Sequence, residues 1–327
     1  MDGREHYGFI LASSILPLLG VLAAAVLLWN RLVGPSDVVA FLVMYLIGGL
    51  GVSTGYHRLL AHRSFQTSRP LKIFFAAAGA MEGQGPPLIW TAHHRRHHRV
   101  ADKPGDPHSP YLEHGPGLRG ALSGLWHAHL GWLFDSELSS DPIRYCPDLA
   151  RDKDIRFISR YFLLFVLAGI VLPGLIGFAL TRSWQGFATG ALWGGLVRFF
   201  VGNHATYAVN SIGHYFGRRR FDTPDESRNV AWLALVSFGE SWHNNHHAFP
   251  KSAFHGLRWW EFDLSALTIR ALEAVGLVWD VVRIPQDRIE QRAEGLRRTG
   301  GGRAAPAQPP RPLAERGNAA AGVSDVE

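Results

Sequence analysis

Long uncharged apolar blocks alternate with polar segments along this chain. Residues 8–29 contain no charged side chain over 22 positions, and residues 38–55 contain none over 18. A third block covers 161–180, and a fourth covers 184–204 with one charge, Arg198, inside it. Because about 20 apolar residues form a helix that crosses a bilayer core, the pattern predicts four transmembrane helices. The alternative for each block is a buried helix in the core of a soluble protein.

Two further stretches could be mistaken for spans or processing signals. Residues 71–90 are apolar but interrupted by Lys72, Glu82 and Pro86, so we expect an interfacial or buried segment there. The first apolar block lies close to the N-terminus but is longer than the apolar core of a typical signal peptide. We therefore expect it to remain in the mature protein.

The positive charges predict the orientation of the helices. The links 30–36 and 181–183 are short and carry one Arg each, whereas the segment 56–160 carries many Lys and Arg residues. Positively charged loops stay on the cytoplasmic side of a membrane. We expect an integral multi-pass protein with two hairpins, in which both termini and the polar segments are cytoplasmic.

Composition changes this picture little. The chain has 327 residues, 47% of them hydrophobic, and a formal net charge of +6. Residues 291–327 are rich in Gly, Arg, Ala and Pro, which is typical of a disordered tail. Residues 1–290 are expected to form one domain that contacts membrane lipid and has no nucleic-acid partner.

Histidines gather in the polar segments that follow the apolar blocks. Eight of them form three clusters, which are His57/His62, His94/His97/His98 and His243/His246/His247. The second and third clusters both have the spacing His-x-x-His-His, which places three imidazoles on one face of a helix. We call these three groups the first, second and third box, and the second and third box could each supply three metal ligands. The five-residue step from His57 to His62 indicates that the helix ends or is distorted between them.

Eight imidazoles indicate a metal site with two ions. One zinc ion takes three or four protein ligands, so eight are too many for it. Imidazole suits iron, copper, nickel and zinc, and the spacing alone does not choose among them. The single cysteine, Cys146, excludes a disulfide or a four-cysteine iron–sulfur centre within one chain. No Gly-x-Gly-x-x-Gly motif stands in the strand-to-helix setting that a flavin or nicotinamide site requires, so redox chemistry would need electrons from another protein.

The residues that flank the boxes complete a larger pattern. They are Asp102, Asp106-Pro107-His108, His129-x-Gly131-Trp132 and Phe249-Pro250. Together with the boxes, they closely resemble the membrane fatty acyl desaturases of the stearoyl-CoA, Δ9 type, from about the second apolar block to near Asp280. The resemblance implies an all-α integral membrane fold with a cytosolic helical cap that carries a diiron site.

The resemblance also implies a ligand set. Asn210-Ser211-Ile212-Gly213-His214 looks like the family's Asn-Ser-x-x-His segment, whose His is a ninth iron ligand and whose Asn reaches iron through water. The set would then be His57, His62, His94, His97, His98, His214, His243, His246 and His247. Supporting or substrate-contacting roles are expected for Trp90, Asp102, Asp106, His129, Trp132 and Trp242. The tryptophans have the alternative role of interfacial anchors.

The activity implied by this resemblance is oxidative. Two irons, O₂ and two external electrons would insert a cis double bond, of Δ9 position, into a saturated C16–C18 acyl chain. No side-chain acid or base can break such unactivated C–H bonds. A membrane diiron hydroxylase would use the same histidines, and a metal-binding or transport protein would also gather histidines, although it should place ligands within its spans.

The acyl carrier and the electron donor stay open. The animal acyl-CoA enzymes have Trp-x-Arg-Asp-His before the second box and a basic pair after Gly-Trp. This chain has Trp90-Thr-Ala-His93-His94 and Phe134-Asp135-Ser136 there. The carrier is therefore CoA or a membrane lipid. No cytochrome b5 motif is present, so the donor is a ferredoxin, a cytochrome b5 or a reductase.

Overall fold

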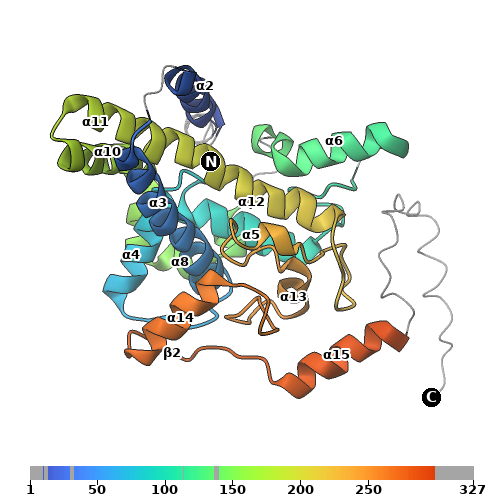
Figure 1. Ribbon diagram of the computed structural model, residues 1–327. Helices are drawn as coiled ribbons and strands as arrows, with labels where there is room; N and C mark the ends of the chain where they lie inside the picture. The colour runs from blue at the N-terminus through green and yellow to red at the C-terminus, as the bar shows by residue number, and fades with distance from the viewer. Residues whose placement is uncertain (1–9, 11–13, 30–32, 113, 136–139, 299–327) are drawn as a thin grey trace, which may run out of the picture.

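The computed structural model of this chain describes residue 10 and residues 14–29, 33–112, 114–135 and 140–298 (Figure 1). Regular structure in these residues is nearly all helical, with two short strands, β1 (Gln66–Thr67) and β2 (Val278–Trp279), which pair antiparallel. The predicted helical fold is confirmed at this level. Five residues of the first predicted span, 8, 9 and 11–13, lie outside the described part.

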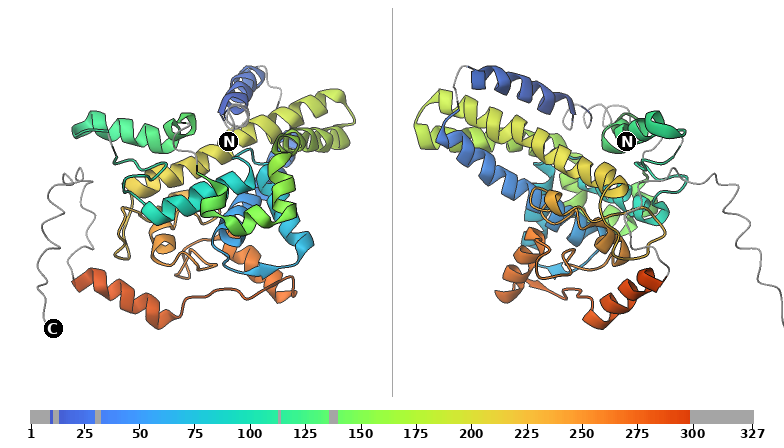
Figure 2. Two further views of the ribbon diagram at one scale, coloured as in Figure 1. Left: turned by 180° about the vertical axis from the view of Figure 1, so that it is seen from behind. Right: turned by 45° about the vertical axis from the view of Figure 1, so that its right-hand side comes forward.

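The apolar helices pack together at one end of the molecule. These are α2 (Leu16–Trp29), α3 (Pro35–Leu50), α10 (Phe162–Thr181) and α11 (Trp184–Gly190), and α3 contacts both α10 and α11 (Figures 1 and 2). Leu22, Val26 and Leu164 on their outer faces are 57%, 60% and 62% exposed. Large contiguous apolar surfaces are rare on soluble proteins, so this end of the molecule indicates membrane association.

Two of the helical stretches are long and apolar enough to cross a membrane. They are Pro35–Ala61 and Phe162–Thr181, and Leu16–Leu28 is a shorter apolar helix. This finding agrees with the second and third predicted spans. It does not test the four-span topology or the sidedness, which stay predictions.

The second helix runs further than its predicted end at 55. α3 continues directly into the π-helical segment η2 (Gly51–Ala61), and His62 is the residue that ends it. The His62 N–H donates to the His57 carbonyl at 3.0 Å, a hydrogen bond between residues five apart. The two rings lie 4.9 Å apart as a result. The predicted distortion between His57 and His62 is thus confirmed, and its physical form is a π-helix.

The fourth apolar block is also part of a longer helix. α11 continues through the π-helical segment η5 (Ala191–Val197) into α12 (Arg198–Tyr215). This helix passes the predicted end at 204, and Asn210 and His214 lie in its C-terminal part. In Figure 1, α12 runs from the end of α11 past α5.

Arg198 faces the interior of this helical packing. It is 0% exposed and forms an ion pair with Glu82, which is 1% exposed. Its guanidinium also donates to three carbonyl oxygens, those of Met81, Gly169 and Gly194, at 3.0–3.1 Å. Arg198 therefore does not extend toward the membrane surface, because each of its three side-chain nitrogens has a partner inside the protein.

The remaining described elements form a polar cap. The helices in it are α4 (Arg69–Ala80), α5 (Pro87–Val100), α6 (Gly117–His129), η3 (Gly131–Phe134), α7 (Pro142–Tyr145), α8 (Pro147–Arg151), α9 (Lys153–Arg160), η6 (Ala231–Leu233), α13 (His243–Ala248), α14 (Leu264–Ala274) and α15 (Gln286–Arg298). α4 contacts η2 and buries Phe75, and the following turn buries Glu82, so the segment 71–90 adopts the buried alternative. The predicted tail boundary at 291 falls within α15, and residues 299–327 lie outside the described part.

Cys146 is predicted to be chemically inert in the folded protein. It is 0% exposed, and burial raises the pKa of its thiol to about 11. The thiolate is the reactive form, so alkylation at pH 8 should be undetectable by mass spectrometry in the native protein and complete after unfolding. Modification of the native protein within minutes would contradict this expectation.

Candidate metal centre

Nine histidines from four elements gather into two clusters. The first cluster contains His57, His62, His94, His98 and His246, and the second contains His97, His214, His243 and His247. Within each cluster, one ring nitrogen of every member lies within 4.8 Å of one ring nitrogen of every other. These are the nine residues expected from the sequence, and the structure brings all of them together.

The sequence predicted that the second and third box would each supply one set of three ligands. This prediction is wrong, because each box is divided between the two clusters. In α5, His94 and His98 join the first cluster while His97 joins the second. In α13 the division is reversed, because His243 and His247 join the second cluster while His246 joins the first. The side chains at positions i+3 and i+4 of a helix point in directions about 100° apart. The i and i+4 histidines therefore face one cluster and the i+3 histidine faces the other.

The inner nitrogens within each cluster lie in direct contact. In the first cluster, the Nε2 atoms of His62 and His94 are 2.7 Å apart, and Nε2 of His246 lies 2.8 Å from that of His98 and 3.0 Å from that of His57. In the second, Nε2 of His214 lies 3.0 Å from that of His243. Each cluster thus presents its nitrogens to one small interior volume.

Carboxylates hold the outer nitrogens of four histidines. The Nδ1–H of His97 donates to Asp106 at 2.9 Å, that of His214 to Asp102 at 2.8 Å and that of His247 to Asp225 at 2.9 Å. The Nδ1–H of His57 contacts Glu240 in the same way. Such carboxylate–histidine pairs fix the tautomer and orientation of metal-binding imidazoles.

This arrangement fits a bound cation. His97 and His247 both donate Nδ1–H to carboxylates, so in their neutral forms both Nε2 atoms carry lone pairs, and these atoms are 3.4 Å apart. Burial lowers the pKa well below the ordinary histidine value for a further set of rings, namely His62, His94, His98, His243 and His246. Neutral imidazoles with facing lone pairs repel one another unless an ion lies between them, so the donor set suits one metal ion in each cluster.

Other residues of the box motifs fix the helices that carry the histidines. Arg95 donates to the carbonyls of Leu60 and Ala61 at 2.8 and 2.9 Å, which caps the end of η2 and joins the second box to the first. Asn244 binds the backbone of Phe221, and Asn245 binds the His255 carbonyl at 2.9 Å. The polar positions between the histidines are therefore structural.

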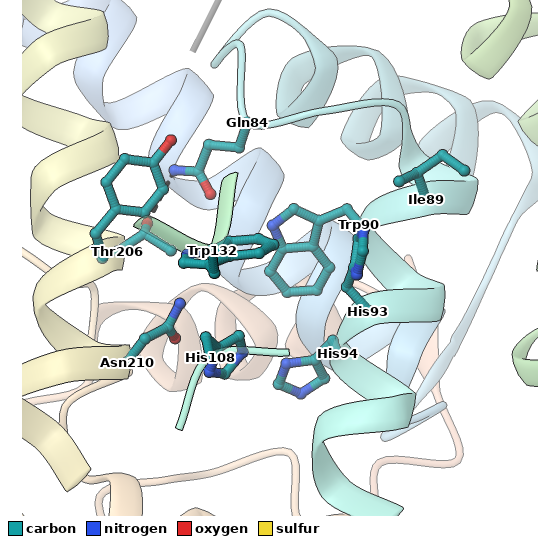
Figure 3. A pocket seen from close by; sticks show the side chains of 10 residues that line it. Gln84, Ile89, Trp90, His93, His94, His108, Trp132, Thr206 and Asn210 are labelled. Carbon is teal, nitrogen blue, oxygen red and sulfur yellow. Dashed lines mark hydrogen bonds between the residues drawn. The ribbon is translucent and has the colours of Figure 1, made fainter. Parts of the chain in front are cut away.

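A cavity lies beside the first cluster. It has a volume of about 500 Å³, including its open mouth, and is lined by Gln84, Ile89, Trp90, His93, His94, His108, Trp132, Thr206, Tyr207 and Asn210 (Figure 3). The Trp90 ring stacks on the His94 ring at 5.1 Å. Aromatic walls with a few polar groups are typical of sites for small apolar ligands. Trp90, Trp132 and Asn210 thus lie where substrate or metal-proximal roles were expected.

Two of the expected supporting residues lie elsewhere. His129 hydrogen-bonds to Ser211 at 3.0 Å and to His204 at 2.8 Å, and it does not line the cavity. Trp242 directly precedes the third box and donates its indole N–H to the Phe262 carbonyl at 2.8 Å. Neither residue belongs to the two clusters.

Sequence reasoning missed three residues next to the clusters. Asp225 and Glu240 hold His247 and His57, and His255 is buried with its ring 4.3 Å from that of His246. Glu240 lies three positions before the third box, a proximity that could have identified it. Asp225 is 22 positions from its partner in a loop without regular spacing, so nothing in the sequence indicated it.

Comparison with known proteins connects this geometry to a family. Residues 35–273 match the family model described as fatty acid desaturase. A hex-5-enoyl-[acyl-carrier protein] acetylenase from Moorena producens is 44% identical over 282 residues, 86% of this chain and 87% of the relative. An sn-1 stearoyl-lipid 9-desaturase from Anabaena variabilis is 39% identical over 74% of this chain and 82% of the relative. Delta-9 acyl-lipid desaturase 1 of Arabidopsis thaliana is 38% identical over 78% of each chain.

Removal of the Asp225 carboxylate should weaken metal binding. Loss of a hydrogen-bond partner behind a ligating histidine typically lowers metal affinity about 10- to 100-fold, so Asp225→Ala should show this loss in competition with a chelator. Asp222→Ala is the matched control, because the Asp222 side chain in the same loop is 71% exposed and contacts no histidine of the clusters. Equal affinities for the two variants would contradict the assigned role of Asp225.

Metal affinity should also depend on pH through His214. Burial opposes the charged form of this imidazole, but the Asp102 carboxylate outweighs burial and raises its pKa to about 9 in the metal-free protein. A metal ion must then displace one proton from His214 below pH 9. We expect the apparent affinity to fall about tenfold per unit as pH drops from 8 to 6. Calorimetry in buffers of different ionisation enthalpy would count the released proton, and a flat profile would exclude this competition.

Proposed function

The chain belongs to the fatty acid desaturase family, and we propose that it inserts a cis double bond at the Δ9 position of a saturated C16–C18 acyl chain. The observation that carries this proposal is the aromatic cavity that adjoins the nine-histidine centre. An acyl chain in this cavity would place its methylenes beside His94 (Figure 3). The family membership makes the chain an oxidoreductase that acts on fatty acyl groups and sets aside the metal-transport alternative.

The proposed cofactor is a pair of iron ions. His57, His62, His94, His98 and His246 would hold one ion, and His97, His214, His243 and His247 would hold the other. Bound iron supplies the activation of O₂ that removes hydrogen from unactivated carbon, which amino-acid side chains cannot do. Asn210 lines the cavity, where its amide can hold a water between the side chain and the centre.

The protein's own residues bind and orient the acyl chain. Trp90 stacks on His94 and presents an apolar wall, and Trp132 forms another wall of the same cavity. Burial of apolar substrate surface against these rings excludes water from the reacting carbons. Glu240, Asp106, Asp102 and Asp225 hold the imidazoles in fixed orientations while the substrate binds.

The proposed carrier is a membrane lipid. The Anabaena and Arabidopsis relatives are named as acyl-lipid desaturases, which supports this carrier and the Δ9 position. The exposed apolar faces of α2 and α10 support a location in the membrane, where lipid substrate is available. We propose the four-span arrangement with a cytoplasmic active site and cytoplasmic termini, and a ferredoxin, cytochrome b5 or reductase as the electron donor.

A second candidate is the conversion of an existing double bond to a triple bond. The relative from Moorena producens, which covers most of this chain, is named as an acetylenase of an acyl group on a carrier protein. The same diiron centre would oxidise an alkene in place of a saturated segment. A hydroxylase is the third possibility, and the products of the three reactions differ in mass.

The test is the acyl profile of cells that express the intact chain. We expect a new Δ9 monoene in the lipid fraction, with the double bond located by mass spectrometry, because the nine histidines gather beside the aromatic cavity. His247→Ala is the negative control, because it removes one proposed ligand. Accumulation of an alkyne would establish the second candidate, and a hydroxy acid would establish the third.

Metal analysis of the purified protein accompanies this experiment. We expect two irons per chain in the intact protein, because two separate groups of histidines could each hold one ion. A metal-loaded protein that yields no new acyl product with a ferredoxin, cytochrome b5 or reductase system would refute the proposed activity. One iron per chain would refute the two-ion centre.

A further inference from the structure

A tenth histidine adjoins the first cluster without belonging to its ligand set. His255 is 1% exposed, and its ring lies 4.3 Å from the ring of His246 and 5.1 Å from the ring of His57. Neither of its ring nitrogens has a hydrogen-bond partner among the described residues. A buried polar group without a partner costs free energy, so this imidazole calls for an explanation.

The backbone holds this ring in place from both sides. The His255 N–H donates to Asp263 at 2.8 Å, and its carbonyl accepts from the Asn245 amide at 2.9 Å. Asp263 pairs in turn with Arg58 of the first box, and Asn245 directly precedes His246 in the third box. The imidazole is therefore positioned by residues of the same motifs that supply the proposed metal ligands.

His246 lacks the carboxylate partner that four other proposed ligands have. Its Nε2 lies in the first cluster, 2.8 Å from Nε2 of His98 and 3.0 Å from that of His57. Its Nδ1 is buried and has no partner among the described residues. A neutral imidazole that offers its Nε2 lone pair to a metal ion carries its proton on Nδ1, which needs an acceptor. His255 can supply one, because one ring nitrogen of every neutral imidazole is an acceptor.

Glu240 lies beside the other nitrogen of His255. One oxygen of this carboxylate binds the Nδ1–H of His57, and the other, Oε1, lies 3.7 Å from Nδ1 of His255. A small turn of the His255 ring would close this contact to about 3 Å, the usual length of an N–H···O hydrogen bond. His255 would then accept from His246 with one nitrogen and donate to Glu240 with the other. All three unpaired nitrogens of His246 and His255 would be satisfied.

We propose that His255 is a positioning residue of the first metal site, which joins His246 to the carboxylate that also orients His57. This inference rests on the proposed two-ion centre and goes beyond it, because it connects two ligands of different boxes. His57 lies in η2 and His246 lies in α13, and these elements are far apart in the sequence. His255 thus ties the orientation of both rings to one carboxylate.

The second cluster contains a matched control. The ring of His108 lies 4.3 Å from that of His97, and its Nδ1 lies 4.0 Å from Asp106. His97, however, donates its own Nδ1–H to Asp106 at 2.9 Å, so it needs no acceptor from His108. The His255–His246 and His108–His97 pairs share one ring separation and differ in whether the proposed ligand lacks a hydrogen bond. Removal of the extra ring should therefore matter only at His255.

The test measures the affinity of the whole protein for ferrous iron, without oxygen, in competition with a chelator. His255→Phe keeps a planar ring but removes both nitrogens. We expect one of the two ions to bind about 10- to 100-fold more weakly, as is typical when the hydrogen-bond partner of a ligand is lost. His255→Gln, whose amide can both accept and donate, should restore most of this affinity. His108→Phe should bind both ions as the wild type does.

Two further measurements distinguish positioning from packing. The unfolding temperature of iron-free His255→Phe should equal or exceed that of the wild type, because the variant removes a buried polar group that has no partner. Mössbauer spectroscopy of this variant loaded with iron should show a change in one of the two iron signals. A lower unfolding temperature, equal losses of affinity in His255→Phe and His108→Phe, or no recovery in His255→Gln would each overturn the inference.

These readouts do not depend on turnover, so they separate this inference from the proposed function. A weakened ion in His255→Phe, together with no new acyl product from the wild type, would support the role of His255 and refute the desaturase activity. Double-bond formation by the wild type with unchanged iron affinity in His255→Phe would overturn the role of His255 and leave the proposed function intact. A wild-type protein that binds no iron would refute both.

Discussion

The crowding of nine imidazoles, six of them buried and three half-buried, is the constraint on which the rest of this structure depends. The Nε2 lone pairs of His97 and His247, 3.4 Å apart, repel unless positive charge lies between them, and the protein holds the rings in place through outer contacts. Carboxylates fix four of the rings, and Arg58 in turn fixes Glu240 and Asp263. Arg95 and the two asparagines of the third box anchor the helices behind them. Much of the polar cap therefore serves to orient nine nitrogen atoms.

The second constraint is the charge that lies among the apolar helices. A buried ion pair stabilises a fold little by itself, but the loss of one partner costs about 3–5 kcal/mol. Glu82 and Arg198 are therefore held to each other, and through the carbonyls of Met81 and Gly169 the pair ties α12 to the end of α4 and to α10.

The sequence was most informative where chemistry and spacing coincide. The apolar blocks predicted helices, the boxes predicted eight of the nine histidines that meet, and the family resemblance supplied the ninth, His214. The five-residue step predicted a distorted helix at His57. The division of each box between two clusters was missed. It could have been predicted, because the i+3 and i+4 side chains of a helix point in different directions. Asp225 and the partner of Arg198 could not be found, because a loop carboxylate and a contact 116 positions away leave no periodic signal. The second and fourth apolar helices were predicted to end too early. Polar residues begin before the helical hydrogen bonding stops, at Ala61 and at Tyr215.

Each cluster draws its ligands from three separate elements, which has a consequence for biosynthesis. The first takes them from the end of η2, from α5 and from α13, and the second takes them from α5, α12 and α13. No contiguous fragment that lacks α13 contains either complete set. A nascent chain emerging from the ribosome consequently cannot assemble a full site until its third box has been translated and docked. An unfinished molecule consequently cannot present either complete set of ring nitrogens, and a metal ion held by a complete set would report that the third box has docked.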